Sequence, residues 1–347
     1  MTLIESPIAA QLQKDGYQFA IDPSRSQEFP QNWKLANPEG LLVPDIANLV
    51  VVNFAADVAT PVADLVDFGF GRRIVSSVPG RDEDSSIQLD HVAQTIAEES
   101  LKKMGDRYGI SMEVLTEHGE GHFFVGDKSN VQIYGALDPI DNSDEYNRGL
   151  DTPPHVALGL YSLDKQPLAA VDINLFTRHI TICRDGRNFT YNPNKNTLTE
   201  IEPLRRDKVT TVRQREFTLA TYMGRRQYVV AMNRYFRKMF EEDRHEKSTL
   251  HGKGGAHLGP YFANHGISEY FMFDEPRGEV DPYVAFAKAA GYQIGEINLE
   301  TAEWSDYRFD PQKSLSKETV PLFGVFETVE LRNEAIEEYK SAAGIAA

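Results

Sequence analysis

The chain has 347 residues, of which 36 are Lys or Arg and 52 are Asp or Glu, so its formal net charge is −16. Hydrophobic residues make up 41% and charged residues 25%, as in an ordinary globular protein. Because affinity for nucleic-acid backbones comes mostly from clustered Lys and Arg, this charge argues against a nucleic-acid partner and also fits poorly with an anionic membrane. A phosphate ligand would need a local device that overcomes the repulsion, and a divalent metal held by carboxylates is such a device.

The length suits two domains or one large layered domain. The single cysteine, Cys183, excludes an internal disulfide framework, and its flanks "HITICRDG" alternate like a strand that ends in a turn. We therefore expect a half-buried thiol. No basic and apolar leader opens the chain, and no apolar run reaches the length of a membrane span, so we expect a cytoplasmic protein with no membrane partner.

Residues 1–60 are predicted to form an N-terminal extension. The first 43 residues or so are polar and rich in Pro, Asn and Gln, without clear periodicity. The apolar stretch 44–71 gives mixed signals, and Pro61 and the glycines are expected to break any long helix. This part of the chain therefore has no clear assignment.

Residues 61–205 are predicted to form an α+β subdomain with a mostly antiparallel sheet. Apolar residues at helical spacing predict a helix from about Asp90 to Gly105 or Gly109. Two strands should follow, in "SMEVLT" and "VQIYGALDPID". A meander of further strands is then predicted in "HVALGLYSL", "PLAAVDINLF" and "HITICRDGRNFTYN".

Residues 206–347 are predicted to form an α/β subdomain, because helical and strand patterns alternate there. An amphipathic helix is predicted over residues 225–243 and a strand in "ISEYFMF". A helix and then a strand are predicted in "DPYVAFAKAAGYQIGEI", and a strand and then a helix in "PLFGVFETVELRNEAIEEYKSAAG".

An acidic turn follows the predicted strand that ends in "YGALDPIDNSDEY". Asp138 and Asp141 stand three apart where Pro139 stops the regular ladder, and the Ile140 carbonyl should face the same mouth. Two carboxylates and a carbonyl make a hard oxygen site suited to Mg²⁺. A helix beginning near Asn142 would add backbone N–H groups. The alternative is that both acids are ordinary turn and N-cap residues, and this short motif does not decide between the two.

Acids also follow two other predicted junctions. Glu117 ends the preceding strand, and Glu279 and Asp281 precede an apolar helix. Acids delivered from three junctions can build a site for two or three metal ions that clamp a phosphate and lower the pKa of a bound water. The acids in "AEES", by contrast, lie inside a predicted helix and are interpreted as its solvated face.

Three segments in order, "TEHGE", "LDPIDNS" and "GEVDPYVAFAKAAGY", resemble the metal-site motifs of the inositol monophosphatase and fructose-1,6-bisphosphatase superfamily. These are Mg²⁺-dependent, lithium-sensitive phosphomonoesterases. The resemblance extends from about Asp90 to the C-terminus. It implies a layered αβαβα sandwich of the sugar-phosphatase type, Mg²⁺ as the cofactor, and a homo-oligomer, most simply a dimer.

The resemblance implies particular ligands. In the third motif, a Glu followed three residues later by a Pro is the bisphosphatase form, so Glu279 with Pro282 is preferred over Asp281. Two positions depart from the motifs: Asn142 replaces a Gly, and His118 replaces an acid. The implied metal ligands are Glu117, Asp138, Asp141, Glu279 and the carbonyl of Ile140.

The resemblance also implies residues for chemistry and for substrate binding. Ser143 matches the residue that orients the attacking water, and Asp90 would support it, although an N-cap role for Asp90 is equally open. Asn142 and Ser143 would meet the phosphate. Lys253 could meet a phosphate or sugar oxygen, or could simply be solvent-exposed.

The function implied is Mg²⁺-dependent hydrolysis of a phosphate monoester of a small polyol or sugar, such as an inositol phosphate or fructose 1,6-bisphosphate. The alternative is a non-catalytic relative that binds metal and phosphate in a regulatory role. Its motivation is the pair of departures at His118 and Asn142.

Overall fold

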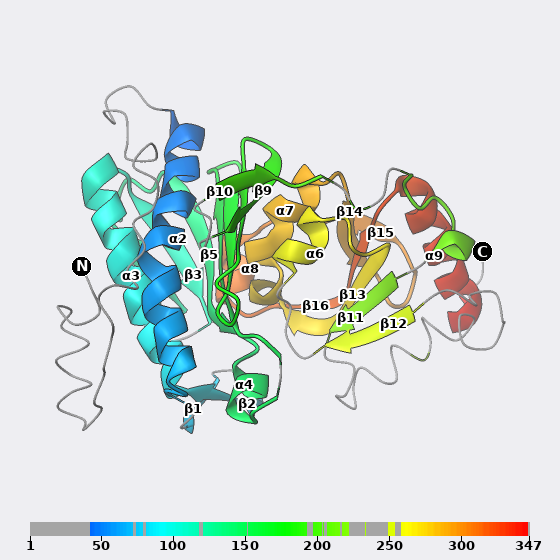
Figure 1. Ribbon diagram of the computed structural model, residues 1–347. Helices are drawn as coiled ribbons and strands as arrows, with labels where there is room; N and C mark the ends of the chain where they lie inside the picture. The colour runs from blue at the N-terminus through cyan, green and yellow to red at the C-terminus, as the bar shows by residue number, and fades with distance from the viewer. Residues whose placement is uncertain are drawn as a thin grey trace.

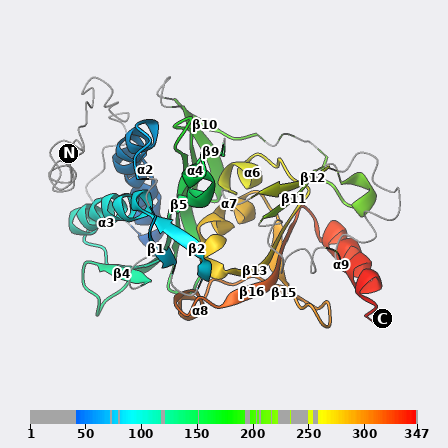
Figure 2. The same cartoon turned by 90° about the horizontal axis from the view of Figure 1, so that it is seen from below.

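Helices and sheets alternate in five layers (Figures 1 and 2). The computed structural model describes residues 42–71, 74–78, 81–117, 121–150, 152–192, 197–202, 204, 207–215, 217–221, 233, 249–253 and 258–345. The layers are helices α2 (Val43–Asp67) and α3 (Gln88–Tyr108), a first large sheet, helices α6 (Gly259–Ala263) and α7 (Val284–Ala289), a second large sheet, and helix α9 (Val329–Ala343). This is the layered αβαβα sandwich that the resemblance implied.

The first sheet has eight strands in the order β10-β9-β8-β7-β6-β5-β3-β4. Its neighbours are antiparallel except for β3 and β5, which run parallel, so the predicted meander is confirmed. Because β3 and β5 run parallel, their carboxyl ends lie at the same edge of the sheet. The strands are β3 (Met112–Thr116), β4 (His122–Val125), β5 (Ile133–Asp141), β6 (His155–Tyr161), β7 (Pro167–Asn174), β8 (Ile180–Arg184), β9 (Arg187–Asn192) and β10 (Thr197–Glu200).

The second sheet has six strands in the order β12-β11-β13-β16-β14-β15. Strand β11 is parallel to both of its neighbours, and the other pairs are antiparallel. The two sheets divide the chain between residues 201 and 216. The strands are β11 (Phe217–Thr221), β12 (Thr249–Lys253), β13 (Glu269–Pro276), β14 (Gln293–Ile297), β15 (Trp304–Asp306) and β16 (Thr319–Phe326).

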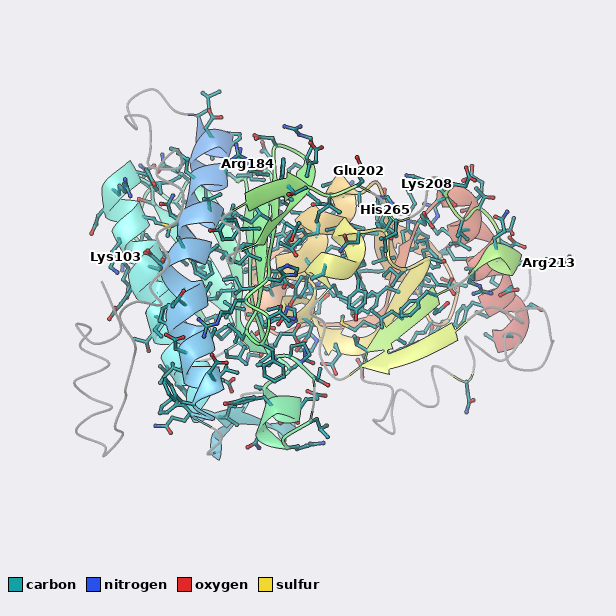
Figure 3. The ribbon with its side chains drawn as sticks, viewed as in Figure 1. Lys103, Arg184, Glu202, Lys208, Arg213 and His265 are labelled. Atoms are coloured by element: carbon teal, nitrogen blue, oxygen red, sulfur yellow. The ribbon has the colours of Figure 1, made fainter. Side chains whose placement is uncertain are left out.

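Short helices fill the middle layer and the connections. Side chains occupy the space between the two sheets, and Lys103 and Arg213 lie toward opposite ends of the stack (Figure 3). The helix predicted over residues 225–243 falls almost wholly outside the described residues. The remaining elements are β1 (Ile74–Val78), β2 (Arg81–Ile87), α4 (Ser143–Asn147), η4 (Val212–Gln214), α6 (Gly259–Ala263), η5 (Arg277–Glu279), η6 (Asp281–Tyr283), α7 (Val284–Ala289), α8 (Pro311–Leu315) and α9 (Val329–Ala343).

Helix α2 (Val43–Asp67) overturns the expectation that Pro61 breaks any long helix. It runs for 25 residues with Pro61 inside it, and the predicted extension ending at residue 60 cuts through it. An internal proline removes one helical hydrogen bond. Here the buried face outweighs that loss, because Phe54, Val58 and Val62 pack at 0% exposure in the first core.

The same helix corrects the expectation about membrane spans. By length and composition alone α2 could cross a membrane, since its most apolar window has a mean hydropathy of 1.7. However, 67% of that window is buried inside the structure, against α3, β7 and β8. That is the position of a core helix, so its hydropathy is weak evidence for a membrane span.

Helix α3 (Gln88–Tyr108) confirms the helix that the sequence predicted from about Asp90. Its C-cap is Gly109, whose φ of 61° is the left-handed conformation that glycine adopts readily. Cys183 on β8 differs from expectation, because it is 2% exposed rather than half-buried. Burial raises the pKa of this thiol to about 12, which disfavours the nucleophilic thiolate form.

We predict that Arg178→Met lowers the free energy of unfolding by about 1–3 kcal/mol, because it leaves a nearly buried carboxylate without its cation. Arg178 donates to Asp64 at 2.7 Å and to Asp67 at 2.5 Å, at the end of α2. The matched control is Arg187→Met, which breaks an exposed pair with Glu200 and should cost about 1 kcal/mol or less. Urea denaturation measures both, and equal losses would contradict the prediction.

Candidate metal centre

The end of β5 carries an irregularity that brings two acids to one side. Asp138 pairs with Ala157 on β6, and Asp141 pairs with His155. The two acids are three residues apart on β5, whereas their partners are two residues apart on β6. In a regular strand, residues three apart point to opposite faces. The extra residue resets this alternation, as β-bulges do. Pro139 therefore interrupts the ladder as predicted.

Glu279 completes a group of three acids. It ends the single turn η5, which follows strand β13 of the second sheet. One carboxylate oxygen from each of Asp138, Asp141 and Glu279 lies within 4.8 Å of the others, and the three residues are 3–4% exposed. The first sheet thus supplies two of the acids, and the segment after β13 supplies the third.

The electrostatics of this group fit a divalent cation. Burial raises the pKa of Asp138 well above its ordinary value, and the charges of Asp141, Glu117, Glu279 and Asp90 raise it further. The buried Oδ1 of Asp138 accepts no hydrogen bond from any described residue. Crowded, buried carboxylate oxygens are the donor set that Mg²⁺ and other hard cations prefer.

Glu117 lies beside the group of three. It is half-buried just after β3, and its charge acts on Asp138. Its backbone carbonyl accepts a hydrogen bond from Lys317 Nζ at 3.2 Å. The predicted ligand Ile140 has its side chain in the core at 3% exposure, as expected. His118 lies outside the described residues.

Asp90 supports the start of α3 without being its N-cap, which is Ile87. From the third helical position, its Oδ2 accepts the backbone N–H of Ile87 at 2.7 Å. It is also 1% exposed, and its charge raises the pKa of Asp138. Its role toward a water molecule stays a prediction.

Asn142, which replaces a glycine of the motif, has a left-handed backbone conformation that glycine adopts readily. Its φ is 67° and its ψ is 29°, and it is the N-cap of α4. Asn tolerates this left-handed region better than most residues do. Its side-chain amide donates to the carbonyl of Pro153 at 3.3 Å. Ser143, the predicted water-orienting residue, is half-buried at the first position of α4.

Asp281 has a different environment from Glu279. It is 0% exposed, and it accepts hydrogen bonds from the hydroxyls of Tyr307 at 2.6 Å and Ser314 at 2.7 Å. Burial raises the pKa of Asp281 to about 6, although both hydroxyl groups lower it. Because both carboxylate oxygens are engaged, the geometry favours Glu279 as the third acid.

Three supporting residues were missed by sequence reasoning. A Cβ at Gly159 on β6 would lie 3.0 Å from the Asp281 carbonyl and from Pro282 Cα, so glycine permits the close approach of this segment. Tyr161 donates to the Asp281 carbonyl, and Tyr283 donates to Asp141 Oδ2 at 2.7 Å. A glycine within the predicted strand "HVALGLYSL" was the available signal, since it often marks such an approach.

A hollow lies beside Glu117, with Glu117 and Gly278 in its wall. Its lining combines apolar and polar residues: Leu115, Thr116, Glu117, Ala136, Leu137, Pro276, Gly278, Asp281, Ser314 and Lys317. Lys253, which the sequence proposed for substrate binding, is the last residue of β12, and its side chain is outside the described part. The structure therefore does not place it at this hollow.

The five layers and the buried acids define a class of protein, the layered αβαβα fold of the sugar-phosphatase type. Solved structures that are similar to this chain specify the fold further. The extragenic suppressor protein suhB from Bartonella henselae has a TM-score of 0.60 at 13% identity over 84% of this chain and 98% of its own. A Thermotoga maritima IMPase has a TM-score of 0.59 at 12% identity, with the same two coverages.

A third structure, SaIMPase-II with inositol monophosphate bound, has a TM-score of 0.54 at 12% identity over 85% of this chain and 98% of its own. The same protein is also solved with 2'AMP bound. No family model and no curated protein matches the chain. The chain has the inositol monophosphatase fold, which confirms the fold that its three motifs implied.

We predict that Asp138→Asn raises the melting temperature of the metal-free protein by about 2 °C or more at pH 8, because it removes a charge from a buried acidic group. The same change should abolish the stabilisation that Mg²⁺ gives the wild type. Thermal melts with EDTA and with Mg²⁺ measure both effects. Asp127→Asn, at an exposed acid, should leave the Mg²⁺ effect intact, and a lower metal-free melting temperature for Asp138→Asn would refute the argument.

We also predict that Gly159→Ala weakens Mg²⁺ binding severalfold and lowers the free energy of unfolding by about 1–3 kcal/mol. The added methyl pushes on the backbone at Asp281, two residues after Glu279. Gly266→Ala is the control, because a Cβ there meets its nearest atom at 3.7 Å. Calorimetric Mg²⁺ titration compares the two variants. Unchanged affinity in Gly159→Ala would show that the close approach does not set the distance between the acids.

Proposed function

We propose that the protein is a Mg²⁺-dependent phosphatase that hydrolyses a phosphate monoester of a small polyol or sugar in the cytoplasm. The observation that carries this proposal is the buried group of Asp138, Asp141 and Glu279, which unites two of the three motifs in one place. The net negative charge of the chain supports the same proposal, because a phosphate could approach these carboxylates only with cations between them.

Five residues would hold the metal: the carboxylates of Asp138, Asp141, Glu279 and Glu117, and the carbonyl of Ile140. When bound, it supplies charge neutralisation of the phosphate and a more acidic bound water.

Ser143 follows directly after the Asp141–Asn142 turn, where its hydroxyl can accept a hydrogen bond from the attacking water and orient it while the proton of the water passes through the hydroxyl to a carboxylate. Asp90, buried and within electrostatic reach of Asp138, is the acid that would support Ser143. The low exposure of the three acids keeps bulk water from screening them.

The substrate class draws support from two directions. SaIMPase-II is solved with inositol monophosphate and with 2'AMP, so this fold accepts phosphate on small organic alcohols of different shapes. In this chain, the hollow beside Glu117 is the place proposed for the alcohol part, with Ser314 and Lys317 as polar groups and Leu137 as an apolar one. This combination suits a small, hydroxyl-bearing group.

The non-catalytic alternative loses one of its two motivations. Asn142 adopts a left-handed backbone as a glycine can, and its side-chain amide donates a hydrogen bond to the Pro153 carbonyl. His118 remains as the other departure. The phosphatase is therefore the better-supported function.

The test is Mg²⁺-dependent release of phosphate from inositol monophosphates, fructose 1,6-bisphosphate and 3′-phosphoadenosine 5′-phosphate. We expect activity on at least one of them in the wild type, and a loss of about a hundredfold or more in kcat/KM for Glu279→Gln, because a ligand carboxylate is removed. Glu99→Gln, on the predicted solvated face of α3, should retain activity.

Two outcomes would count against this function. Metal binding without hydrolysis of any compound would favour the regulatory relative. Equal rates in wild type and Glu279→Gln would show that the phosphate is cleaved elsewhere.

A further inference from the structure

Tyr283 lies directly behind the acidic group. Its ring is 0% exposed, and its hydroxyl donates to Oδ2 of Asp141 at 2.7 Å. It ends η6, four residues after Glu279, so one short segment delivers both the third acid and a donor to the second. Both short helices, η5 and η6, contact β5, and η6 also contacts β6 and β7.

We propose that Tyr283 is a positioning residue of the metal centre, which holds Oδ2 of Asp141 so that the other carboxylate oxygen is presented to the cation. This rests on the metal centre of the proposed function. It assigns to Tyr283 a role that none of the three motifs contains.

Such a donor is needed because the neighbouring carboxylates repel one another. Before a cation arrives, Asp141 faces Asp138 and Glu279 at close range, and like charges favour any rotamer that separates them. The residue also stands at the end of a bulged strand, next to Asn142 in the left-handed conformation. A neutral phenol can fix the carboxylate without adding charge.

A purely structural role for Tyr283 is the competing explanation, since its ring also packs in the middle-layer core. The chain provides a matched control in Tyr307. This tyrosine is 2% exposed and donates to Asp281 Oδ1 at 2.6 Å, which is also a buried carboxylate. Asp281 lies outside the group of three acids, so only Tyr283 supports a candidate ligand.

The experiment compares metal binding by wild type, Tyr283→Phe and Tyr307→Phe. Calorimetric titration of each metal-free protein with Mg²⁺, or with Mn²⁺ followed by electron paramagnetic resonance, gives the affinity directly. We expect Tyr283→Phe to bind about tenfold or more weakly, the usual effect of losing a partner of a ligand, and Tyr307→Phe to stay within about twofold of wild type. Higher Mg²⁺ should restore the activity of Tyr283→Phe.

The outcomes separate this proposal from the function. Equal affinity in wild type and Tyr283→Phe overturns the positioning role while leaving the phosphatase intact. Equal weakening in both tyrosine variants also overturns it, because general loss of core packing then explains the effect. A wild type that binds Mg²⁺ but hydrolyses nothing removes the phosphatase, yet weaker binding by Tyr283→Phe would still support the positioning role. A wild type that binds no divalent cation overturns both.

A crystal structure of the wild type with Mn²⁺ tests the same point without any variant, should Tyr283→Phe fail to fold. Anomalous scattering locates the ion. We expect Asp141 to bind it through one oxygen while Tyr283 keeps the other. Binding through both oxygens, with the Tyr283 hydroxyl displaced, would overturn the proposal.

Discussion

The central constraint on this fold is the repulsion among carboxylates that are crowded together away from water. Burial raises the pKa of Asp138, and four neighbouring acids raise it further, so the charged group is costly in the empty protein. Nothing in the local propensity of these residues favours such an arrangement. It persists because the surrounding layers fix the backbone from which each acid projects, and because a cation would turn the repulsion into attraction.

Both large sheets contribute to holding the acidic residues in place. On the first sheet, the bulge of β5 turns Asp138 and Asp141 to one side. Gly159 on the same sheet leaves room for the backbone of Asp281 and Pro282. From the second sheet comes the segment after β13, which is joined to the first sheet by the hydrogen bond from the Tyr161 hydroxyl to the Asp281 carbonyl. The carboxylate of Asp281 is engaged separately, by Tyr307 and Ser314, and does not belong to the group of three acids.

Much of this could be predicted from the sequence, for physical reasons that also explain the gaps. Alternation and helical spacing identified α3, β5 to β9, β13, β14, β16 and α9, because these elements have regular patterns. Helix α2 was missed because the local penalty of Pro61 is visible in sequence, whereas the burial that offsets it is not. The acids were found because their motifs are short and contiguous. Gly159 and Tyr283 were not, because each acts on a segment more than a hundred residues away.

The separation of the acids along the chain has a consequence for how the protein folds. Asp138 and Asp141 are presented as soon as β5 pairs with β6, but Glu279 arrives only when the second sheet docks. Contacts of such long sequence separation form late, because their loop entropy must be overcome first. A half-folded chain therefore lacks a complete set of ligands, and tight metal capture would mark the moment at which the two sheets close on one another.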